Sequence, residues 1–389
     1  MTNASKFQRR IGELHGSSGP TAVFIGGIHG NEPSGVLALV AVFNELANRS
    51  QPIKGNVYML AGNLKALSQQ KRFISEDLNR IWTSEKLIAL SNKKLDDLQN
   101  EEREQYELQT ELNRIIDNHQ EALYFMDLHT TSSATIPFMT VNDSLLNRKF
   151  TKQFPVPTIL GIEEYLSGPI LSHMNENGYV AFGFEGGQHA DKEAINNHIA
   201  FIYLSLHYAE IIRLDDTELD NYVNRLKPKN KRLIHAFEIY HRHKIKNGIP
   251  FSMEPGFENF QFLDKDVLIA TENEREIKTT RKGRIFMPLY QTQGAEGFFA
   301  IRKIPGFFLW VSRVLRIARL HQMFVNLPGI SPNNNYGTFK VNRKKARFLT
   351  KQLIHLFGYR IIERHPSYYV IQSREMNARK KEYRKARWY

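Results

Sequence analysis

The spacing of four short apolar runs in residues 1–210 constrains the fold more than any other feature of the sequence. Each run is bounded by Gly, Asn or Asp, as buried strands are, and helical patterns such as residues 34–47 and 93–121 lie between them. Strands that alternate with helices pack as layers around a largely parallel sheet. We therefore predict an α/β domain with a sheet flanked by helices. The four runs are residues 21–25, 57–60, 123–126 and 179–184.

The pattern of the sequence changes after a further helical pattern at residues 197–212. A polar stretch at 214–232 marks a domain boundary, and short strand patterns beyond it alternate with turns rich in Gly, Asn, Asp and Pro. Such a pattern, with strands at 267–270 and 284–289, is typical of a small all-β domain. We expect three parts: an α/β domain over 1–215, a small β domain over 216–304 and a basic C-terminal extension over 305–389.

The charge of the chain is concentrated at its C-terminal end. The net charge is +13, and residues 301–389 contain 20 Lys and Arg against 3 Asp and Glu, whereas residues 1–300 contain 33 against 37. The basic character belongs to the extension, so it does not indicate that the whole protein binds nucleic acid. We expect no obligate nucleic-acid partner.

Cysteine is absent, and this restricts the chemistry of any metal site. The chain has no Cys, so disulfides and thiolate ligands are excluded and a metal must bind His, Asp or Glu. Residues 1–20 are polar and lack the apolar stretch of a signal peptide. No uncharged apolar run approaches the ~20 residues that span a bilayer. We therefore expect a cytoplasmic protein.

A glycine-rich turn follows the first apolar run and leads into a helix. It reads Gly-Gly-Ile-His-Gly-Asn-Glu-Pro-Ser-Gly over residues 26–35, so His29 and Glu32 are three residues apart and both can reach one ion. Ligands of open α/β sheets gather at the carboxyl ends of strands, where this turn falls. Taken alone, the pattern also fits a turn with a solvated His and a capping Glu.

Two further apolar runs end in residues with metal or acid–base chemistry. His129 follows the third run and would complete a set of two His and one Glu, the set expected of a catalytic zinc, with Asp127 orienting a ligand. Glu185 ends the fourth run and could move a proton between water and a leaving nitrogen. A surface His and a structural carboxylate are the alternatives when each motif is taken by itself.

A charged loop lies between the second and third runs. Residues 72–80 contain Arg72, Asn79 and Arg80, which could hold a substrate carboxylate and a polarised carbonyl. Arginine suits this task because its planar fork matches a carboxylate. Alone, the loop fits a solvated charged segment equally well. The order of strand end, basic loop, strand end and strand end is the arrangement that one active-site mouth requires.

Over residues 12–304 the chain resembles the succinylglutamate desuccinylase and aspartoacylase family, which has a zinc-carboxypeptidase-like fold. The motifs that carry this resemblance are the turn of His29 and Glu32, Asp-Leu-Asn-Arg at 77–80, Asp-Leu-His at 127–129 and Gly-Phe-Glu at 183–185. The resemblance implies a mixed sheet flanked by helices, with a small β domain that partly covers the site.

The resemblance also implies one Zn²⁺ per chain and a role for each matching residue. His29, Glu32 and His129 match the zinc ligands, and Glu185 matches the general base and acid. Arg72 matches the arginine that polarises the scissile carbonyl, while Asn79 and Arg80 match residues that hold the substrate carboxylate. The implied reaction is hydrolysis of the amide bond of a small N-acylated amino acid by zinc-activated water.

Two departures from the aspartoacylase branch bear on the substrate. That branch has an arginine shortly before the catalytic Glu and a tyrosine in the β domain, both of which bind the substrate. The corresponding stretches here, residues 173–177 and 294–299, contain no arginine and no tyrosine. These differences argue against an acyl-aspartate and, more generally, against a doubly acidic substrate.

The C-terminal extension leaves other functions open. Residues 307–320 form a basic amphipathic helical pattern, with Trp310 and Val314 on one side and Arg313, Arg316 and Arg319 on the other. Such a helix most often docks its apolar side on its own protein, but it can also lie on an anionic membrane. The basic run at 343–347 and the tail at 379–389 could contact RNA, although charged tails are usually solvated.

Two alternatives to the predicted hydrolase function therefore remain. One is a zinc carboxypeptidase that acts on peptides. The other is a non-catalytic binding protein whose basic extension engages nucleic acid or membrane. The complete set of His29, Glu32, His129 and Glu185 argues against a protein that has lost its activity. The sequence does not decide whether the chain forms a homo-oligomer.

Overall fold

The computed structural model describes residues 7–389 except 50, 247, 319–325, 334–336 and 348–350. Its main sheet is formed by β1 (Arg10–His15), β2 (Ser17–Gly26), β3 (Lys54–Ala61), β4 (Leu123–Thr131), β5 (Phe138–Val141), β6 (Thr158–Leu160), β7 (Val180–Gln188), β8 (Ala236–Lys244), β10 (Phe262–Leu263), β13 (Gly283–Phe286) and β14 (Glu296–Lys303). Among the described residues these make one 11-stranded sheet, in the order β1-β3-β2-β4-β7-β5-β6-β8-β14-β13-β10.

The direction of the strands divides this sheet into two halves. The central strands β3, β2, β4 and β7 are parallel to one another, as the alternation of strands and helices predicts, and the edge strand β1 is antiparallel to β3. β5 turns the sheet antiparallel to β7, while β6 is parallel to β5 and to β8. From β8 onward the pairs with β14, β13 and β10 are antiparallel. The result is the mixed α/β sheet of the zinc-carboxypeptidase-like fold.

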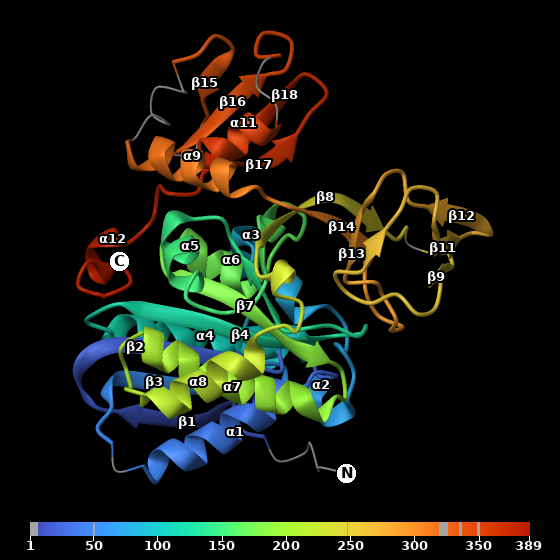
Figure 1. Cartoon of the computed structure of the whole chain (residues 1–389). Coiled ribbons are helices and arrows are strands. Elements are labelled where there is room, and N and C mark those ends of the chain that lie inside the picture. The colour runs from blue at the N-terminus through green and yellow to red at the C-terminus, as the bar shows by residue number, and fades with distance from the viewer. Residues whose placement is uncertain (1–6, 50, 247, 319–325, 334–336, 348–350) are drawn as a thin grey trace.

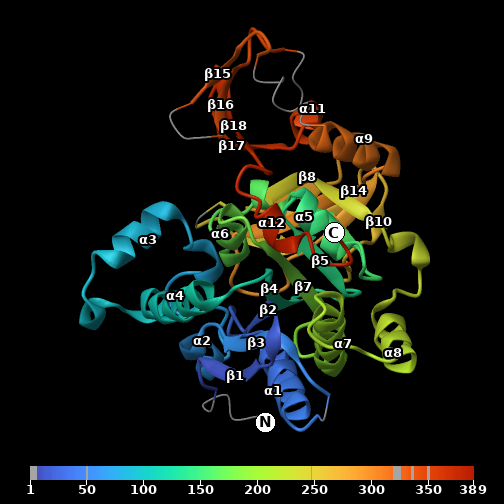
Figure 2. The ribbon, with the colours of Figure 1, turned by 90° about the vertical axis from the view of Figure 1, so that its left-hand side faces the viewer.

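Helices cover both faces of the parallel half (Figures 1 and 2). The helices that follow the first strands are α1 (Ser34–Ala47), α2 (Leu64–Gln69), η2 (Leu78–Arg80), α3 (Ser84–Ser91), η3 (Leu95–Asp97) and α4 (Asn100–Asn118). The helices that follow β4 are α5 (Leu145–Thr151), η4 (Ile162–Glu164), α6 (Ile170–Glu176), α7 (Lys192–Tyr208), α8 (Asp216–Leu226) and η5 (Lys231–Leu233).

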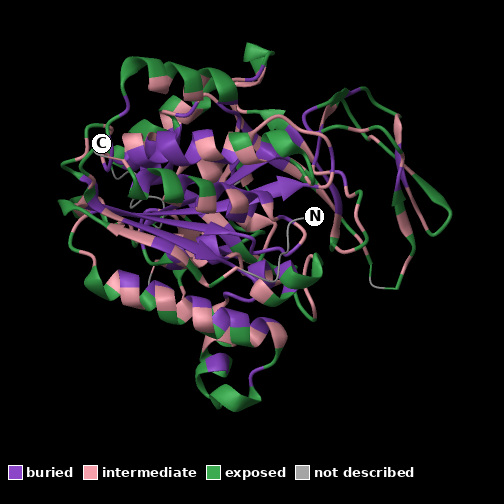
Figure 3. Ribbon diagram, turned by 90° about the horizontal axis from the view of Figure 1, so that it is seen from below, coloured by how far each residue is buried: buried purple, intermediate pink, exposed green. Residues whose placement is uncertain are grey.

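Alternating residues of the central strands supply the two hydrophobic cores. In β2, Ala22 and Phe24 pack in one cluster with side chains of α1 and α7, whereas Val23 and Ile25 pack in a second cluster with side chains of α4 and α6. Successive side chains of a strand point to opposite faces, so a strand covered on both sides is apolar at every position. β4 is accordingly buried throughout, and β2, β3 and β7 are buried except near one end (Figure 3).

The polar stretch at 214–232, predicted to be a boundary, contains the helix α8. A capping box starts this helix, because the Asp215 side chain accepts a hydrogen bond from the backbone of Glu218 and the Glu218 side chain accepts one from the backbone of Asp215. The ring of Tyr222 stacks on Tyr203 of α7 at a centroid distance of 4.9 Å. The Asp-x-x-Glu spacing of the capping box was the sequence signal for this helix.

The strands beyond residue 235 both extend the main sheet and form a smaller one. β8 pairs with β6, so β8, β14, β13 and β10 continue the sheet of the α/β half. A separate three-stranded antiparallel sheet, in the order β12-β11-β9, lies beside them. Its strands are β9 (Phe251–Met253), β11 (Leu268–Glu272) and β12 (Arg275–Lys278).

The C-terminal extension folds around a sheet of its own, which Figure 1 shows at the top of the molecule. A cluster of buried side chains, including Val341, Ile354 and Ile371, forms its core. Its described elements are α9 (Gly306–Ile317), β15 (Ile330–Pro332), β16 (Thr338–Asn342), α11 (Lys351–Leu356), β17 (Tyr359–Arg364), β18 (Tyr368–Ser373) and α12 (Lys380–Tyr383). The four strands have the order β15-β16-β18-β17 in the described part of the extension.

The tail at 379–389 packs against the α/β half, which corrects the expectation of a solvated segment. Tyr383 is fully buried, and its hydroxyl donates to the Leu123 carbonyl and accepts from the Val180 backbone. Trp388 donates from Nε1 to the hydroxyl of Tyr124 at 3.1 Å. These contacts join the tail to the first residues of β4 and β7. They are made by the aromatic side chains of the tail and not by its basic side chains.

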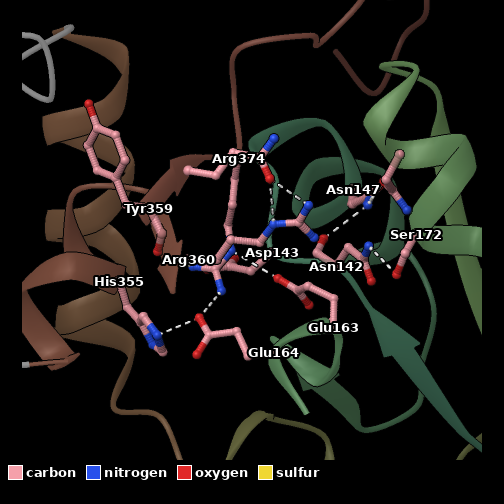
Figure 4. A network of polar contacts seen from close by, with 12 residues as sticks. Asn142, Asp143, Asn147, Glu163, Glu164, Ser172, His355, Tyr359, Arg360 and Arg374 are labelled. Atoms are coloured by element: carbon pink, nitrogen blue, oxygen red, sulfur yellow. Dashed lines mark hydrogen bonds and ion pairs between the residues drawn. The ribbon is translucent and has the colours of Figure 1, made fainter. Parts of the chain in front are cut away.

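A buried ion-pair cluster fixes the extension to the α/β half (Figure 4). Arg374 donates from Nε to Glu163 at 2.9 Å and from Nη2 to Glu164 at 2.7 Å. Asp143 accepts a hydrogen bond from Nη2 of Arg316 at 2.9 Å. Burial alone would raise the pKa of the Asp143 carboxyl, but the surrounding arginines hold it well below its usual range. Unpairing any of these buried charges is costly, so the cluster sets the geometry between the two parts.

In the described part of the chain, no helix combines the length and the apolarity that crossing a membrane requires.

Candidate active site

The turn after β2 brings His29 and Glu32 to the carboxyl end of the sheet. Gly27 has a φ of +71°, a left-handed conformation that glycine adopts without strain. A side chain at Gly30 would meet the backbone of Ala66, because a Cβ there would lie 2.0 Å from the Ala66 carbonyl carbon. The backbone of Glu32 donates to the carbonyl of His29 at 3.1 Å. The glycines of the motif therefore allow a tight turn, and this turn directs the side chains of His29 and Glu32 toward each other.

His129 joins this pair from the neighbouring strand β4. One carboxylate oxygen of Glu32 lies 2.9 Å from Nδ1 of His29, and the other lies 3.0 Å from Nδ1 of His129. The backbone of Thr130 donates to Glu32 at 3.0 Å. One atom from each of His29, Glu32 and His129 lies within 4.8 Å of the others, and all three residues are buried. This group can hold a metal ion.

The outer nitrogen of each imidazole is held by a carboxylate. Nε2 of His29 lies 3.0 Å from Asp77, and Nε2 of His129 lies 2.6 Å from Asp127. A carboxylate that accepts from Nε2 leaves the lone pair of Nδ1 available to a metal ion, which is how proteins orient metal-binding histidines. Asp127 makes the contact expected of it, whereas Asp77 had no assigned role in the sequence. The donor set therefore fits a divalent cation of the zinc type.

The pKa shifts of Glu32 and Asp77 agree with this arrangement. Burial alone would raise the pKa of the Glu32 carboxyl, but the charge of His29 and hydrogen bonds with both imidazoles hold that pKa well below its usual range. Burial likewise opposes ionisation of Asp77, and His29, Arg72 and Arg80 lower its pKa. Glu32 is thus an ionised oxygen donor at neutral pH.

Glu185 reaches the same site from β7. Strand pairing sets it beside His129, because the two residues are partners in the parallel register of β4 and β7. Its carboxylate is buried, and Oε2 has no hydrogen-bond partner among the described residues. Burial raises the pKa of Glu185 to about 8. A carboxyl group with such a pKa can accept and release a proton near neutral pH.

Arg72 lies between the carboxylates of Asp77 and Glu32. It donates from Nη2 to Asp77 at 3.1 Å, and its Nη1 lies 3.5 Å from Glu32. Desolvation would lower the pKa of this guanidinium, but the charges of Asp77 and Glu32 raise it above its usual value. A permanent cation therefore lies next to the group that can bind a metal.

Asn79 and Arg80 also line the pocket. Asn79 accepts a hydrogen bond from the backbone of Ile170 at 3.0 Å, and its Nδ2 lies 3.5 Å from Nε2 of His129. Nη2 of Arg80 lies 3.7 Å from the carboxylate of Glu296 in β14. The guanidinium is about a quarter exposed, so it can exchange partners with a ligand.

One pocket of about 150 Å³ contains these groups. All seven residues assigned from the sequence line it: His29, Glu32, Arg72, Asn79, Arg80, His129 and Glu185. They come from four separate segments of the chain, which the parallel strands bring to one edge of the sheet. The predicted grouping of the motifs around one mouth is therefore found in the structure.

The structure adds residues from the second half of the chain that the sequence analysis did not assign. Gln291 accepts from Asn31 at 2.8 Å and contacts Nε2 of His189 at 3.1 Å, which ties the loop before β14 to the metal-site turn. Glu296 and Phe299 of β14 also line the pocket. Glu296 is an acidic residue directly before the apolar run of residues 297–301, and this was the sequence signal for it.

The sheet order, with these residues at the carboxyl edge of its parallel strands, defines a zinc-carboxypeptidase-like domain. Residues 18–177 match the model of the succinylglutamate desuccinylase/aspartoacylase catalytic domain. Over this segment, which is less than half of the chain, the protein is similar to the succinylglutamate desuccinylase/aspartoacylase family, as its motifs indicate. A succinylglutamate desuccinylase of Photorhabdus laumondii is 34% identical over 68 residues, a match that covers 18% of this chain and 21% of that relative.

Solved structures share the fold. A succinylglutamate desuccinylase/aspartoacylase from Rhodobacter sphaeroides superposes with a TM-score of 0.55 at 17% identity, covering 75% of this chain and 88% of that one. A succinylglutamate desuccinylase from Chromobacterium violaceum superposes with a TM-score of 0.54 at 14% identity, covering 78% and 96%. At these identities the likeness shows the common architecture.

Proposed function

We propose that this protein is a zinc-dependent hydrolase that cleaves the amide bond of a small N-acylated amino acid or related amine. The observation that carries the proposal is the convergence of His29, Glu32 and His129 within 4.8 Å, with a carboxylate behind each imidazole. The family of the catalytic segment and the names of its relatives agree with a deacylase.

His29, Glu32 and His129 would hold the zinc ion. Two neutral imidazoles and one carboxylate leave an open coordination position, which is typical of catalytic zinc sites. The bound ion would supply Lewis acidity and lower the pKa of water toward ~7. The carboxylates of Asp77 and Asp127 would keep both imidazoles in the tautomer that binds the ion.

Glu185 is the proton carrier of the proposed reaction. Its carboxylate accepts a proton from the attacking water and then donates that proton to the departing nitrogen, so the products are a carboxylic acid and a free amine. Arg72 stabilises the negative charge that develops on the carbonyl oxygen, since its cation is already fixed by Asp77. Asn79 and Arg80 bind the carboxylate of the substrate.

The size of the pocket favours a small substrate over a peptide. It encloses about 150 Å³, and Gln291, Glu296 and Phe299 from the second half of the chain form part of its wall. Sites for drug-sized ligands have ~300 to 1,000 Å³. A peptide would need these residues to move away, which makes the carboxypeptidase alternative less favourable.

The test combines metal analysis with amine release from a panel of N-acyl amino acids and short peptides. We expect about one zinc per chain and turnover of a member of the acyl panel. Glu185→Gln keeps the size of the side chain and removes the proton carrier, so it should retain zinc and lose turnover. Glu32→Gln should lose both.

Two outcomes would contradict the proposal. A metal-replete preparation without stoichiometric metal would refute the assigned ligands and would favour the binding-protein alternative. Turnover of peptides but of no N-acyl amino acid would replace the deacylase by a carboxypeptidase.

A further inference from the structure

The helix α9 presents an apolar face to solvent. Phe307, Trp310 and Ile317 are 65%, 60% and 59% exposed, and Phe308 and Val314 are also exposed. Residues 307, 310, 314 and 317 follow the spacing of one helical stripe. We call the five exposed side chains of residues 307, 308, 310, 314 and 317 the α9 face. Monomeric proteins rarely leave so many large apolar side chains together in water, and such patches mark interaction sites.

The orientation of α9 differs from the expected one at Arg316, Trp310 and Val314, whereas Arg313 is exposed as expected. The sequence analysis expected the apolar side to dock on the protein and the arginines to point outward. In the structure Arg316 is fully buried, while Trp310 and Val314 are exposed. Arg319 lies outside the described residues. The helix is therefore amphipathic in the expected way, but it is held by its polar side.

Buried polar contacts of Arg316 keep the α9 face outward. Its guanidinium donates to the carboxylate of Asp143 at 2.9 Å, to the Asp143 carbonyl at 2.8 Å and to the His355 carbonyl at 2.8 Å. Turning the apolar stripe inward would expose this arginine and remove one of the arginine partners of the buried Asp143 carboxylate, which is unfavourable. The α9 face is consequently a fixed feature of the fold.

Cations surround the α9 face. Arg313 lies on the exposed side of the helix, and neither it nor Lys152 has an ion-pair partner within the described ranges. Burial, followed by repulsion from Arg313 and Lys380, lowers the pKa of Lys149. Residues 301–389 as a whole contain 20 Lys and Arg against 3 Asp and Glu. An apolar stripe thus lies within a positively charged surface.

A cleft of about 1110 Å³ lies between α9 and α5 and is lined by side chains of both helices. Trp310 and Ile317 line it on the α9 side, and Lys149 and Lys152 line it on the α5 side. The α/β half therefore contributes cations to the surface on which the α9 face lies. The lining also includes apolar side chains such as Phe154 and Phe339.

We propose that the α9 face and its surrounding cations dock on an anionic phospholipid bilayer. Aromatic rings such as Trp310 are favoured at the level of the lipid headgroups, and aliphatic side chains such as Ile317 enter the acyl boundary. Lys and Arg next to the surface are attracted by the negative headgroups. The protein would lie on the bilayer with the helix parallel to it.

Other occupants match this surface less well. A single-stranded nucleic acid would pair with the cations and stack on the aromatic rings, but it would leave Val314 and Ile317 exposed to water. A second copy of the chain, related by a two-fold axis, would bring Arg313 and the other cations of both copies together. The combination of aliphatic, aromatic and cationic side chains is satisfied by an anionic bilayer.

The test is co-sedimentation of the full chain with phosphatidylcholine vesicles that contain phosphatidylglycerol. Binding is expected, and it should weaken with added salt and be lost on pure phosphatidylcholine. The triple variant Phe307→Ser, Trp310→Ser and Ile317→Ser should bind at least about tenfold more weakly. Arg313→Gln and Lys152→Gln should each reduce binding about fivefold at low salt.

Two controls separate docking from a general loss of structure. Ile88→Ser removes an equally exposed apolar side chain from α3, far from the α9 face in sequence, and should bind like the wild type. Trp310→Phe should still bind, but it should lose the blue shift of tryptophan fluorescence that vesicles induce. Thermal unfolding of each variant should match that of the wild type.

Three results would overturn the proposal. The first is failure of the wild-type chain to sediment with the anionic vesicles. The second is tighter binding to a single-stranded RNA oligonucleotide that the triple variant retains in full. The third is a wild-type dimer in sedimentation equilibrium that the triple variant abolishes, because the α9 face would then be covered by a second copy.

Discussion

Asp127 and His129 lie two residues apart on β4, and the Asp127 carboxylate lies 2.6 Å from Nε2 of His129 while Nδ1 of the same ring faces Glu32. Alternate positions of a strand share one face of the sheet, so the strand itself supplies both the proposed ligand and its supporting carboxylate. His29 has the same arrangement with Asp77, although that partner is 48 residues away.

Replacing Asp127 by Asn should weaken metal binding without removing a ligand. The amide keeps the shape of the carboxylate but holds the His129 tautomer less firmly, and loss of such a partner costs about 10- to 100-fold in affinity. Competition with a chelator measures the change. Asp77→Asn should act in the same direction through His29, and an unchanged affinity in both variants would contradict the proposed metal site.

Replacing Arg80 by Gln should raise KM more than it lowers kcat. Arg80 is proposed to bind the substrate carboxylate, and a charge-assisted hydrogen bond contributes about 1.5 to 3 kcal/mol, or about 10- to 100-fold in KM. Steady-state kinetics on the N-acyl substrate measures both constants. Arg72→Gln is the matched comparison, since it should lower kcat. An equal fall of kcat in the Arg80 variant would argue against a role in binding alone.

Removing the charge of Glu164 should destabilise the fold and change its response to acid. Burial alone would raise the pKa of this carboxyl, but His355, Arg374 and Lys351 lower it to about 2 from 4.5. Because the pKa is lowered on folding, the stabilisation is complete above pH 4.5 and is lost as the pH falls toward 2.

Glu164→Gln should therefore lower the free energy of unfolding at neutral pH by about 3 to 5 kcal/mol, since Arg374 would lose a buried partner. The difference from the wild type should shrink as the pH falls below 4.5. Denaturant unfolding at several pH values measures both effects. Glu363→Gln, at an exposed ion pair with His365, should change stability by less than about 1 kcal/mol.

Replacing Tyr383 by Phe should test how firmly the C-terminal tail is attached. The change keeps the buried ring and removes the hydroxyl that bonds to the Leu123 carbonyl and the Val180 backbone. Leaving these buried groups without a partner should cost about 1 to 3 kcal/mol. Thermal unfolding measures the loss, and Tyr389→Phe, at a partly exposed residue, should have little effect.

Local patterns predicted much of the α/β half. The helical pattern at 34–47 coincides with α1, and the four apolar runs fall in β2, β3, β4 and β7. The motifs were informative because each one follows a buried strand, and parallel strands end at a common edge. The polar stretch at 214–232 was harder to interpret, because α8 exposes most of its surface and has a weak apolar signal.

The sequence by itself determined the four central strands and the long helices of the α/β half and the residue types available for a metal, since these depend on short-range patterns and on the absence of cysteine. Only the tertiary structure decided that Asp77 supports His29 and that Glu296 reaches Arg80, because these contacts join segments far apart in the chain. It also decided which side of α9 is buried. The periodicity of a helix gives the angle between its faces, but the outward orientation depends on Asp143, a residue 173 positions away that binds Arg316.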